Sequence, residues 1–179
     1  MTTFVLHKYI TMKSRTILLS MIVGAMASAG LKADTQPLDT VPPAGDFTYV
    51  ASAAGTTDSL YGLRAPRVLV YFYDPTCEDC EALRAQLAAS DTINRLIDEG
   101  QLQVLAVYPD NDSTTWADHA PHLPARWING YDRDLTVMRA EGFLFNSLPA
   151  LYLLDAERRF LLREATEAEA VEKELMSAY

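Results

Sequence analysis

Two cysteines, Cys77 and Cys80, are the residues of this sequence best suited to chemistry. They are the only cysteines in the 179 residues, and they stand in the stretch FYDPTCEDC. A pair with this spacing is compatible with a dithiol that exchanges with other disulfides, a structural disulfide, or half of a metal site. Glu78 and Asp79 lie between the cysteines, and their negative charge opposes formation of a thiolate.

The two alternatives to a redox dithiol are supported unequally by the sequence. A Cys77–Cys80 disulfide closes so short a loop that its stabilisation falls well under the ~3 kcal/mol of a fifteen-residue loop. A metal site needs further ligands, and His119 and His122 of the stretch DHAPHLP would complete a set of two cysteines and two histidines. The redox dithiol is the interpretation we prefer, and it needs neither a metal nor a cofactor. The alternative is a non-catalytic module that binds a metal or senses redox state through Cys77 and Cys80 with His119 and His122.

A strand followed by a helix would position the cysteines. The stretch RVLVYFY at 67–73 is β-branched and aromatic on both faces, as in a central strand covered on both sides. Pro75 ends this strand, and residues 77–90 have a helical composition. Cys77 then stands at a helix start, where unpaired N–H groups and the helix dipole stabilise a thiolate. Cys80, one turn further in, is placed to resolve a mixed disulfide formed by Cys77.

The rest of the chain predicts alternating strands and helices. Residues 109–126 are rich in turn formers and predict a loop. The other predicted elements are a short strand at 47–50, a helix restarting at Ser90 or Asp91, a buried strand at 102–108, a short helix at about 134–140, strands at 149–155 and 160–164, and a closing helix at 166–179. Strands separated by helices run parallel, whereas the tight hairpin is antiparallel, so we expect an α/β fold with a mixed sheet.

A proline directly precedes the predicted strand at 149–155, in the stretch NSLPALYLLD. The start of a strand is a natural place for a cis X–Pro bond, here Leu148-Pro149.

Together these stretches resemble the thioredoxin-like superfamily, and within it the exported TlpA-like thiol–disulfide oxidoreductases of bacteria. The resemblance covers about Asp46 to Tyr179 and rests on VLVYFYDPTCEDC, QVLAVYPD, WINGYD and SLPALYLLD. It implies a thioredoxin-like fold over residues 47–179, in which helices flank a central mixed β-sheet.

The resemblance also implies roles for individual residues. Cys77 would be the nucleophile and Cys80 the resolving thiol. Pro149 would be the cis-proline that lies against the cysteines, and the backbone of Leu148 would be presented to the substrate. Protein thiols and disulfides are the implied partners, with a membrane or periplasmic electron donor to restore the dithiol.

The active-site stretch departs from the thioredoxin pattern at several positions. Thr76 stands where thioredoxin has a tryptophan, Glu78-Asp79 replaces its Gly-Pro, and Tyr71 replaces its buried acid. Asp74 and Glu141 are the acids we consider for proton transfer to and from Cys80. Since acids near the cysteines disfavour the thiolate that strong oxidants stabilise, we expect a reductase or isomerase.

The first 33 residues predict a secretory signal peptide. A basic start at 12–15, an apolar run at 17–27 and an A-x-A cleavage motif at 27–29 follow one another. Met12 opens directly onto the basic part, so we expect translation to start there. The apolar run is too short to span a bilayer comfortably, and we expect no stable membrane anchor.

Composition places the remainder of the chain among exported acidic domains. With 49% hydrophobic residues the chain is long enough for one globular domain, and the prolines of 34–46 predict an extended lead-in. The net charge of the chain is −9. Cleavage of the signal would make it more negative, because the first 33 residues contain no acidic residue and four basic ones, Lys8, Lys13, Arg15 and Lys32. Such a domain repels nucleic acid and anionic lipid. We expect a monomer in the periplasm of a Gram-negative bacterium, where disulfides persist.

Overall fold

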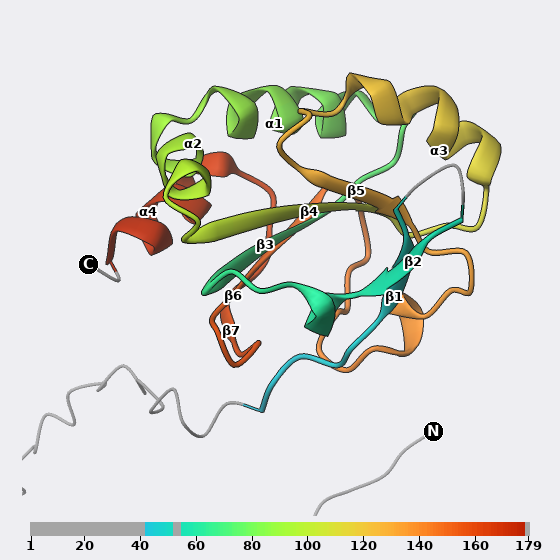
Figure 1. Ribbon diagram of the computed structural model, residues 1–179. Helices are drawn as coiled ribbons and strands as arrows, with labels where there is room; N and C mark the ends of the chain where they lie inside the picture. Colours follow the sequence, from blue (N-terminus) through green and yellow to red (C-terminus); the bar gives the residue numbers. More distant parts are fainter. Residues whose placement is uncertain (1–41, 52–54, 178–179) are drawn as a thin grey trace, which may run out of the picture. The chain divides into compact units, whose positions relative to one another are not determined.

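The computed structural model describes residues 42–51 and 55–177 (Figure 1). The predicted signal peptide and residues 34–41 of the lead-in lie outside these ranges, so both remain predictions. The described end of the lead-in pairs with the rest of the domain: Pro43 forms a β-bridge with Arg159, and the Ala44 N–H donates to the Arg158 carbonyl at 2.8 Å. No helix within the described ranges has the length and apolar character needed to cross a membrane.

The described residues form a seven-stranded mixed sheet with the order β2-β1-β5-β4-β3-β6-β7. The central strand β3 runs parallel to β4 and antiparallel to β6, and β6 forms an antiparallel hairpin with β7. This confirms the predicted mixed sheet and the thioredoxin-like fold class. The strands are β1 (Thr48–Val50), β2 (Thr57–Ser59), β3 (Arg67–Phe72), β4 (Leu102–Tyr108), β5 (Ile128–Tyr131), β6 (Ala150–Leu154) and β7 (Phe160–Ala165).

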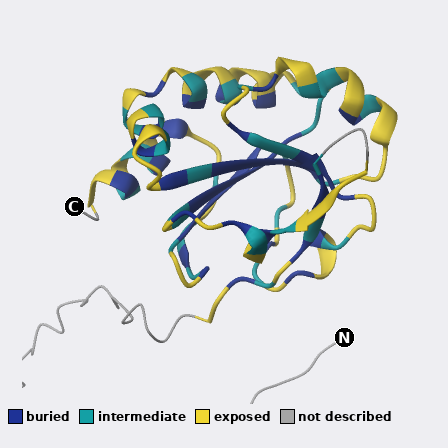
Figure 2. Cartoon of the chain, viewed as in Figure 1, coloured by how far each residue is buried: buried dark blue, intermediate teal, exposed yellow. Residues whose placement is uncertain are grey.

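Four α-helices of the described residues flank this sheet and contribute side chains to one of its two core clusters. They are α1 (Glu78–Ala89), α2 (Asp91–Asp98), α3 (Ser113–His119) and α4 (Ala168–Ser177). Alternate residues of β3, including Leu69 and Tyr71, belong to the same cluster as these helices. The central strands are buried along their length, as Figure 2 shows in dark blue. Burial on both faces explains why the sequence of β3 is apolar without alternation.

The second core cluster, on the other face of β3, is rich in aromatic rings. Phe72 packs edge-on against Phe143 with ring centroids 5.6 Å apart and is stacked on Phe145 at 4.9 Å. The single-turn helices η2 (Leu60–Gly62) and η4 (Val137–Arg139) place Leu60 and Val137 in this cluster. Segments with little regular structure therefore cover this face through large side chains.

The prediction of a loop at 109–126 was wrong, because this segment contains helix α3. The Asp112 carboxylate accepts the backbone N–H groups of Thr114 (3.0 Å) and Thr115 (3.1 Å) at the start of this helix. An aspartate in this position satisfies N–H groups that have no partner within the helix. This capping outweighs the low helix propensity of the serine and threonines that follow.

Two other segments also differ from the prediction. The helix predicted at 134–140 is only the single turn η4, because Leu135 takes a left-handed conformation (φ 50°) that an α-helix does not accommodate. The stretch WINGYD contains strand β5, which pairs parallel with β4. A Cβ at Gly130 would lie 2.7 Å from the ring of Tyr49, so glycine allows β1 to approach β5.

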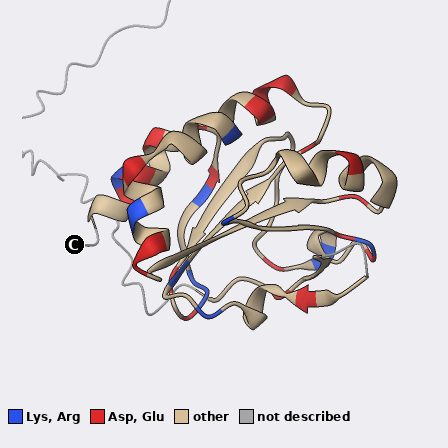
Figure 3. Ribbon diagram, turned by 45° about the horizontal axis from the view of Figure 1, so that its top comes forward, with Lys and Arg blue, Asp and Glu red and all other residues tan. Residues whose placement is uncertain are grey.

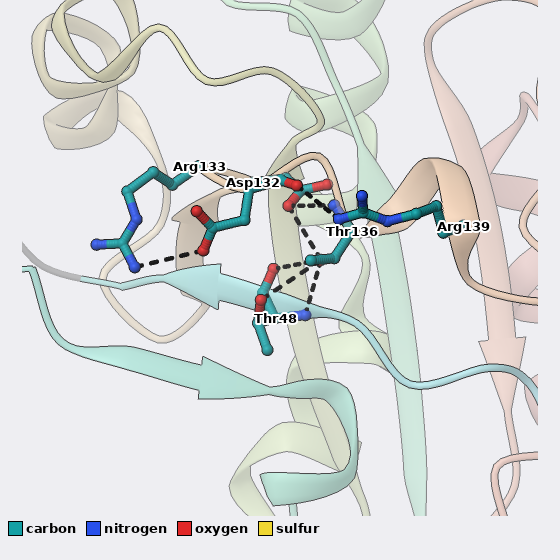
Figure 4. Close-up of polar contacts among 6 residues, drawn as sticks. Thr48, Asp132, Arg133, Thr136 and Arg139 are labelled. Atoms are coloured by element: carbon teal, nitrogen blue, oxygen red, sulfur yellow. Dashed lines mark hydrogen bonds and ion pairs between the residues drawn. The ribbon is translucent and has the colours of Figure 1, made fainter.

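A buried carboxylate holds the chain after β5. Asp132 is 0% exposed and accepts the N–H groups of Thr136 and Val137, both at 2.8 Å. The Thr136 hydroxyl lies 3.0 Å from the Asp132 carboxylate and accepts the Thr48 N–H at 3.0 Å (Figure 4). The carboxylate thus joins the segment after β5 to strand β1.

We expect Asp132→Ala to lower the free energy of unfolding by about 2–3 kcal/mol, because it leaves buried N–H donors without their charged acceptor. Urea unfolding followed by circular dichroism measures this change. Asp134→Ala is the matched control: Asp134 pairs with Arg133 at an exposed site, where an ion pair contributes little. Equal unfolding midpoints for the two variants would contradict the role assigned to Asp132.

Candidate functional site

A tight turn after β3 delivers the chain to the first cysteine. The Asp74 carboxylate accepts both the backbone N–H and the hydroxyl of Thr76, each at 2.7 Å, and the Cys77 N–H donates to the Asp74 carbonyl at 3.2 Å. A side chain that bonds to the backbone two residues on is typical of Asp in turns. Thr76, which replaces the tryptophan of thioredoxin, therefore helps to shape this turn.

Cys77 occupies the N-cap position of α1, and both cysteines are free thiols. The Cys80 N–H donates to the Cys77 sulfur at 3.2 Å, so the sulfur replaces the oxygen that usually caps a helix. Cys77 is half-buried, whereas Cys80 is 2% exposed. The predicted strand, turn and helix are confirmed, and Cys77 is the more accessible thiol of the pair.

The cis-proline segment lies against Cys77. Leu148-Pro149 is cis, as predicted, and the Leu148 carbonyl is 3.9 Å from the Cys77 sulfur. The antiparallel register pairs Phe72, the last residue of β3, with Ala150, the first residue of β6. Sheet pairing thus brings the two predicted halves of the site together.

The second cysteine of the pair is buried. Burial raises the pKa of the Cys80 thiol to about 12, and the neighbouring Cys77 side chain acts in the same direction. The Tyr71 hydroxyl donates to the Cys80 carbonyl at 2.6 Å and so supports the first turn of α1. Burial also raises the pKa of Tyr71, so at neutral pH this residue cannot replace the missing buried acid as a proton acceptor.

Of the two acids considered for proton transfer, only Asp74 lies near the cysteines. A hydrogen bond from the Asp74 backbone lowers the pKa of the Cys80 thiol, whereas the negative charge of the Asp74 side chain raises it. The Glu141 carbonyl instead accepts the Gly45 N–H at 2.7 Å, and the adjacent Ala140 belongs to the aromatic cluster on the other face of the sheet. The structure therefore contradicts a role for Glu141 at Cys80.

His119 and His122 line a surface cavity of about 500 Å³ together with Cys77. Helix α3 carries His119 to this place, and the turn that follows carries His122. Within residues 42–51 and 55–177, no group of three or more His, Cys, Asp or Glu residues is placed to hold a metal ion. Within these ranges the four predicted ligands are thus not grouped around one point, although the two histidines line the same cavity as Cys77.

The two histidines differ in their surroundings. His119 is half-buried, with its ring 5.5 Å from that of Tyr73, and His122 is exposed. Burial lowers the pKa of His119 below its usual value, and the charge of His122 acts in the same direction. The sequence indicated these residues only as ligands, since the segment was expected to be a loop.

Acidic residues surround Cys77 on the helix side. Glu78, Asp79 and Glu81 all lie in the first turn of α1, and Arg84 forms an ion pair with Glu81. Figure 3 shows acidic residues in red along the helices. Negative charge is favourable near a helix N-terminus but opposes a thiolate at the same place.

A second cavity, of about 460 Å³, lies on the cis-proline side of α1. Leu83, Leu148 and Pro149 contribute apolar surface to it, and Asp79, Gln86 and Glu167 contribute polar groups.

Comparison with known proteins agrees with this architecture. No protein-family model matches the chain, and no curated protein matches it. Among solved structures, the C-terminal domain of an uncharacterized protein from Bacteroides fragilis is 32% identical, with a TM-score of 0.70, and the match covers 75% of this chain and 94% of that domain.

A thioredoxin-like protein from Bacteroides caccae is 36% identical over 75% of this chain, with a TM-score of 0.68; the match covers 48% of that chain, or about half its length. A putative thiol:disulfide interchange protein DsbE from Chlorobium tepidum has the same fold at 20% identity and a TM-score of 0.60, with coverage of 77% of this chain and 96% of that one. With the mixed sheet, the cysteine pair at a helix start and the adjacent cis-proline, these matches show that the chain belongs to the thioredoxin-like superfamily.

Proposed function

We propose that this protein is a periplasmic thiol–disulfide oxidoreductase that works in the reducing or isomerising direction through Cys77 and Cys80. The observation that carries the proposal is the position of the Cys77 sulfur, at the start of α1 and 3.9 Å from the Leu148 carbonyl. At this place a sulfur can attack a substrate disulfide while the Leu148 backbone holds the substrate chain.

The proposed reaction transfers two electrons from the dithiol to the substrate. The Cys77 thiolate attacks one substrate sulfur, the substrate S–S bond breaks, and the departing sulfur leaves as a thiolate that takes up a proton. Cys80 then loses its proton and attacks the Cys77 sulfur. This step releases the second substrate thiol and leaves a Cys77–Cys80 disulfide, which a membrane or periplasmic dithiol donor must reduce.

Support for the activity and its location comes from different sources. The interchange activity is what the name of the Chlorobium tepidum structure states for that protein, which shares the fold. The location rests on the signal peptide predicted for residues 1–33. The direction rests on the three acids in the first turn of α1, which weaken the thiolate stabilisation that strong oxidants of this fold rely on.

Insulin reduction with dithiothreitol as electron donor tests the activity. We expect Cys77→Ser to reduce insulin no faster than dithiothreitol alone, because the variant lacks the attacking sulfur. Cys80→Ser is the matched variant: it keeps the nucleophile, and once dithiothreitol has been removed the reduced variant should accumulate a mixed disulfide with insulin, detectable by non-reducing electrophoresis. Wild-type turnover by Cys77→Ser would refute the proposal.

The reduction potential tests the direction. We expect a value well below the about −120 mV of the strongest oxidants of this fold. Replacing the two acids in Glu78→Gln/Asp79→Asn should raise the potential by about 20 mV, since 30 mV corresponds to about 1.4 kcal/mol for a two-electron couple. Equilibration with glutathione buffers measures both values. A potential near that of the strong oxidants, or a fall in the double variant, would contradict the assigned direction.

Alkylation separates the roles of the two cysteines. We expect iodoacetamide at neutral pH to label Cys77 of the reduced protein and leave Cys80 unmodified, because Cys80 is 2% exposed and burial raises its pKa to about 12. Peptide mass spectrometry identifies the labelled residue. Urea-unfolded protein is the control, in which both cysteines should react equally. Preferential labelling of Cys80 in the folded protein would reverse the assignment.

A further inference from the structure

The proposed reaction needs a proton acceptor for the Cys77 thiol, and neither the first turn of α1 nor Cys80 supplies one. The first turn of α1 adds negative charge, which opposes ionisation without removing the proton. Cys80 is itself protonated at neutral pH, and one carboxylate oxygen of Asp74 already accepts two hydrogen bonds from Thr76.

Helix α3 places an imidazole in the cavity that Cys77 lines. The Trp116 indole N–H of this helix donates to the Asn129 side-chain oxygen at 3.2 Å, and the Tyr73 hydroxyl donates to the same oxygen at 3.1 Å. The Asn129 side-chain oxygen therefore holds both helix α3 and Tyr73, the residue that follows β3. The ring of Tyr73 then lies 5.5 Å from the ring of His119.

We propose that His119 accepts the proton of the Cys77 thiol during attack on the substrate disulfide and then returns it to the departing substrate thiolate. In the first half, the S–H bond of Cys77 breaks and an N–H bond forms on the imidazole. In the second half, that N–H bond breaks as the departing sulfur is protonated, so the imidazole ends neutral. The inference rests on the proposed function, and it assigns the proton acceptor of that reaction.

The surroundings of His119 favour the neutral imidazole, which is the form that accepts a proton. Burial lowers its pKa, and His122, whose ring is 5.7 Å away, and Arg84 of α1 act in the same direction. Glu81 of α1 and Asp74 of the turn act in the opposite direction. The neutral form therefore predominates at pH 7, and the nearby carboxylates stabilise the imidazolium once the proton has moved.

The pH dependence of Cys77 alkylation tests the inference without a protein substrate. We expect His119→Ala to slow iodoacetamide labelling of the reduced full chain about tenfold at pH 7, as for the loss of a modest general base. At about pH 10 the two proteins should react within about twofold of each other, because hydroxide can then take the thiol proton in place of the imidazole. Added imidazole should restore the rate of the variant at pH 7.

The other variants separate proton transfer from packing. His119→Gln keeps a polar side chain of similar length without the basic nitrogen, and it should show the same pH-dependent loss. Asp118→Asn, exposed on the same helix, should leave the rate unchanged. All reactions contain EDTA, so a bound metal ion does not contribute.

Three results would overturn the inference. The labelling rate of His119→Ala could equal that of the wild type at pH 7, or it could be reduced equally at both pH values. The pH-dependent loss of rate could also appear in His122→Gln or Asp74→Asn and not in the His119 variants. Insulin reduction remains a separate measurement. A protein that labels as expected but does not reduce insulin would refute the proposed function alone, and normal labelling of His119→Ala in a protein that reduces insulin would refute the proton acceptor alone.

Discussion

The antiparallel pairing of β3 with β6 is the constraint on which the site depends. The Leu148 carbonyl and the Cys77 sulfur come from positions 71 residues apart and are brought together because Phe72 pairs with Ala150. Both strands are buried within the sheet, and β3 is paired on its other side with β4. A shift of one residue in this register would turn every core side chain of β6 to the opposite face, so packing and site geometry are specified together.

The two faces of the sheet are covered by different kinds of structure. One face carries the four helices and with them the cysteines and His119. The other is filled by aromatic residues, among them Phe72, Phe143 and Tyr152, in edge-to-face contacts. Such contacts add to the free energy gained by burial, and they fix ring positions. The aromatic face thus holds the central strands in place while the helical face carries the reactive groups.

Local sequence was sufficient to predict the central part of the fold and the cysteine half of the site. Strand β3 and helix α1 each have a clear local signal, an apolar run and a helical composition. The proline at the start of the next site strand is a weak signal alone and becomes informative only together with the upstream cysteine pair. Helix α3 depends on the capping of Asp112, and β5 depends on Gly130 lying against Tyr49. The position of the histidines beside Cys77 follows from tertiary contacts through Asn129, which no local pattern reveals.

In the proposed reaction, the capping of α1 by the Cys77 sulfur connects electron transfer to folding. The sulfur that would exchange electrons also accepts the N–H of Cys80 at the helix start. A thiolate is a stronger acceptor than a sulfur in a disulfide, so the cap is stronger when the Cys77 thiol has lost its proton than when the sulfur is part of a disulfide. In a closed thermodynamic cycle, the difference in folding free energy between the two redox states must appear as a difference in reduction potential between the folded and the unfolded chain. For this two-electron couple, about 1.4 kcal/mol corresponds to about 30 mV. The stability of the helix start is therefore one of the quantities that set the reducing power of the protein.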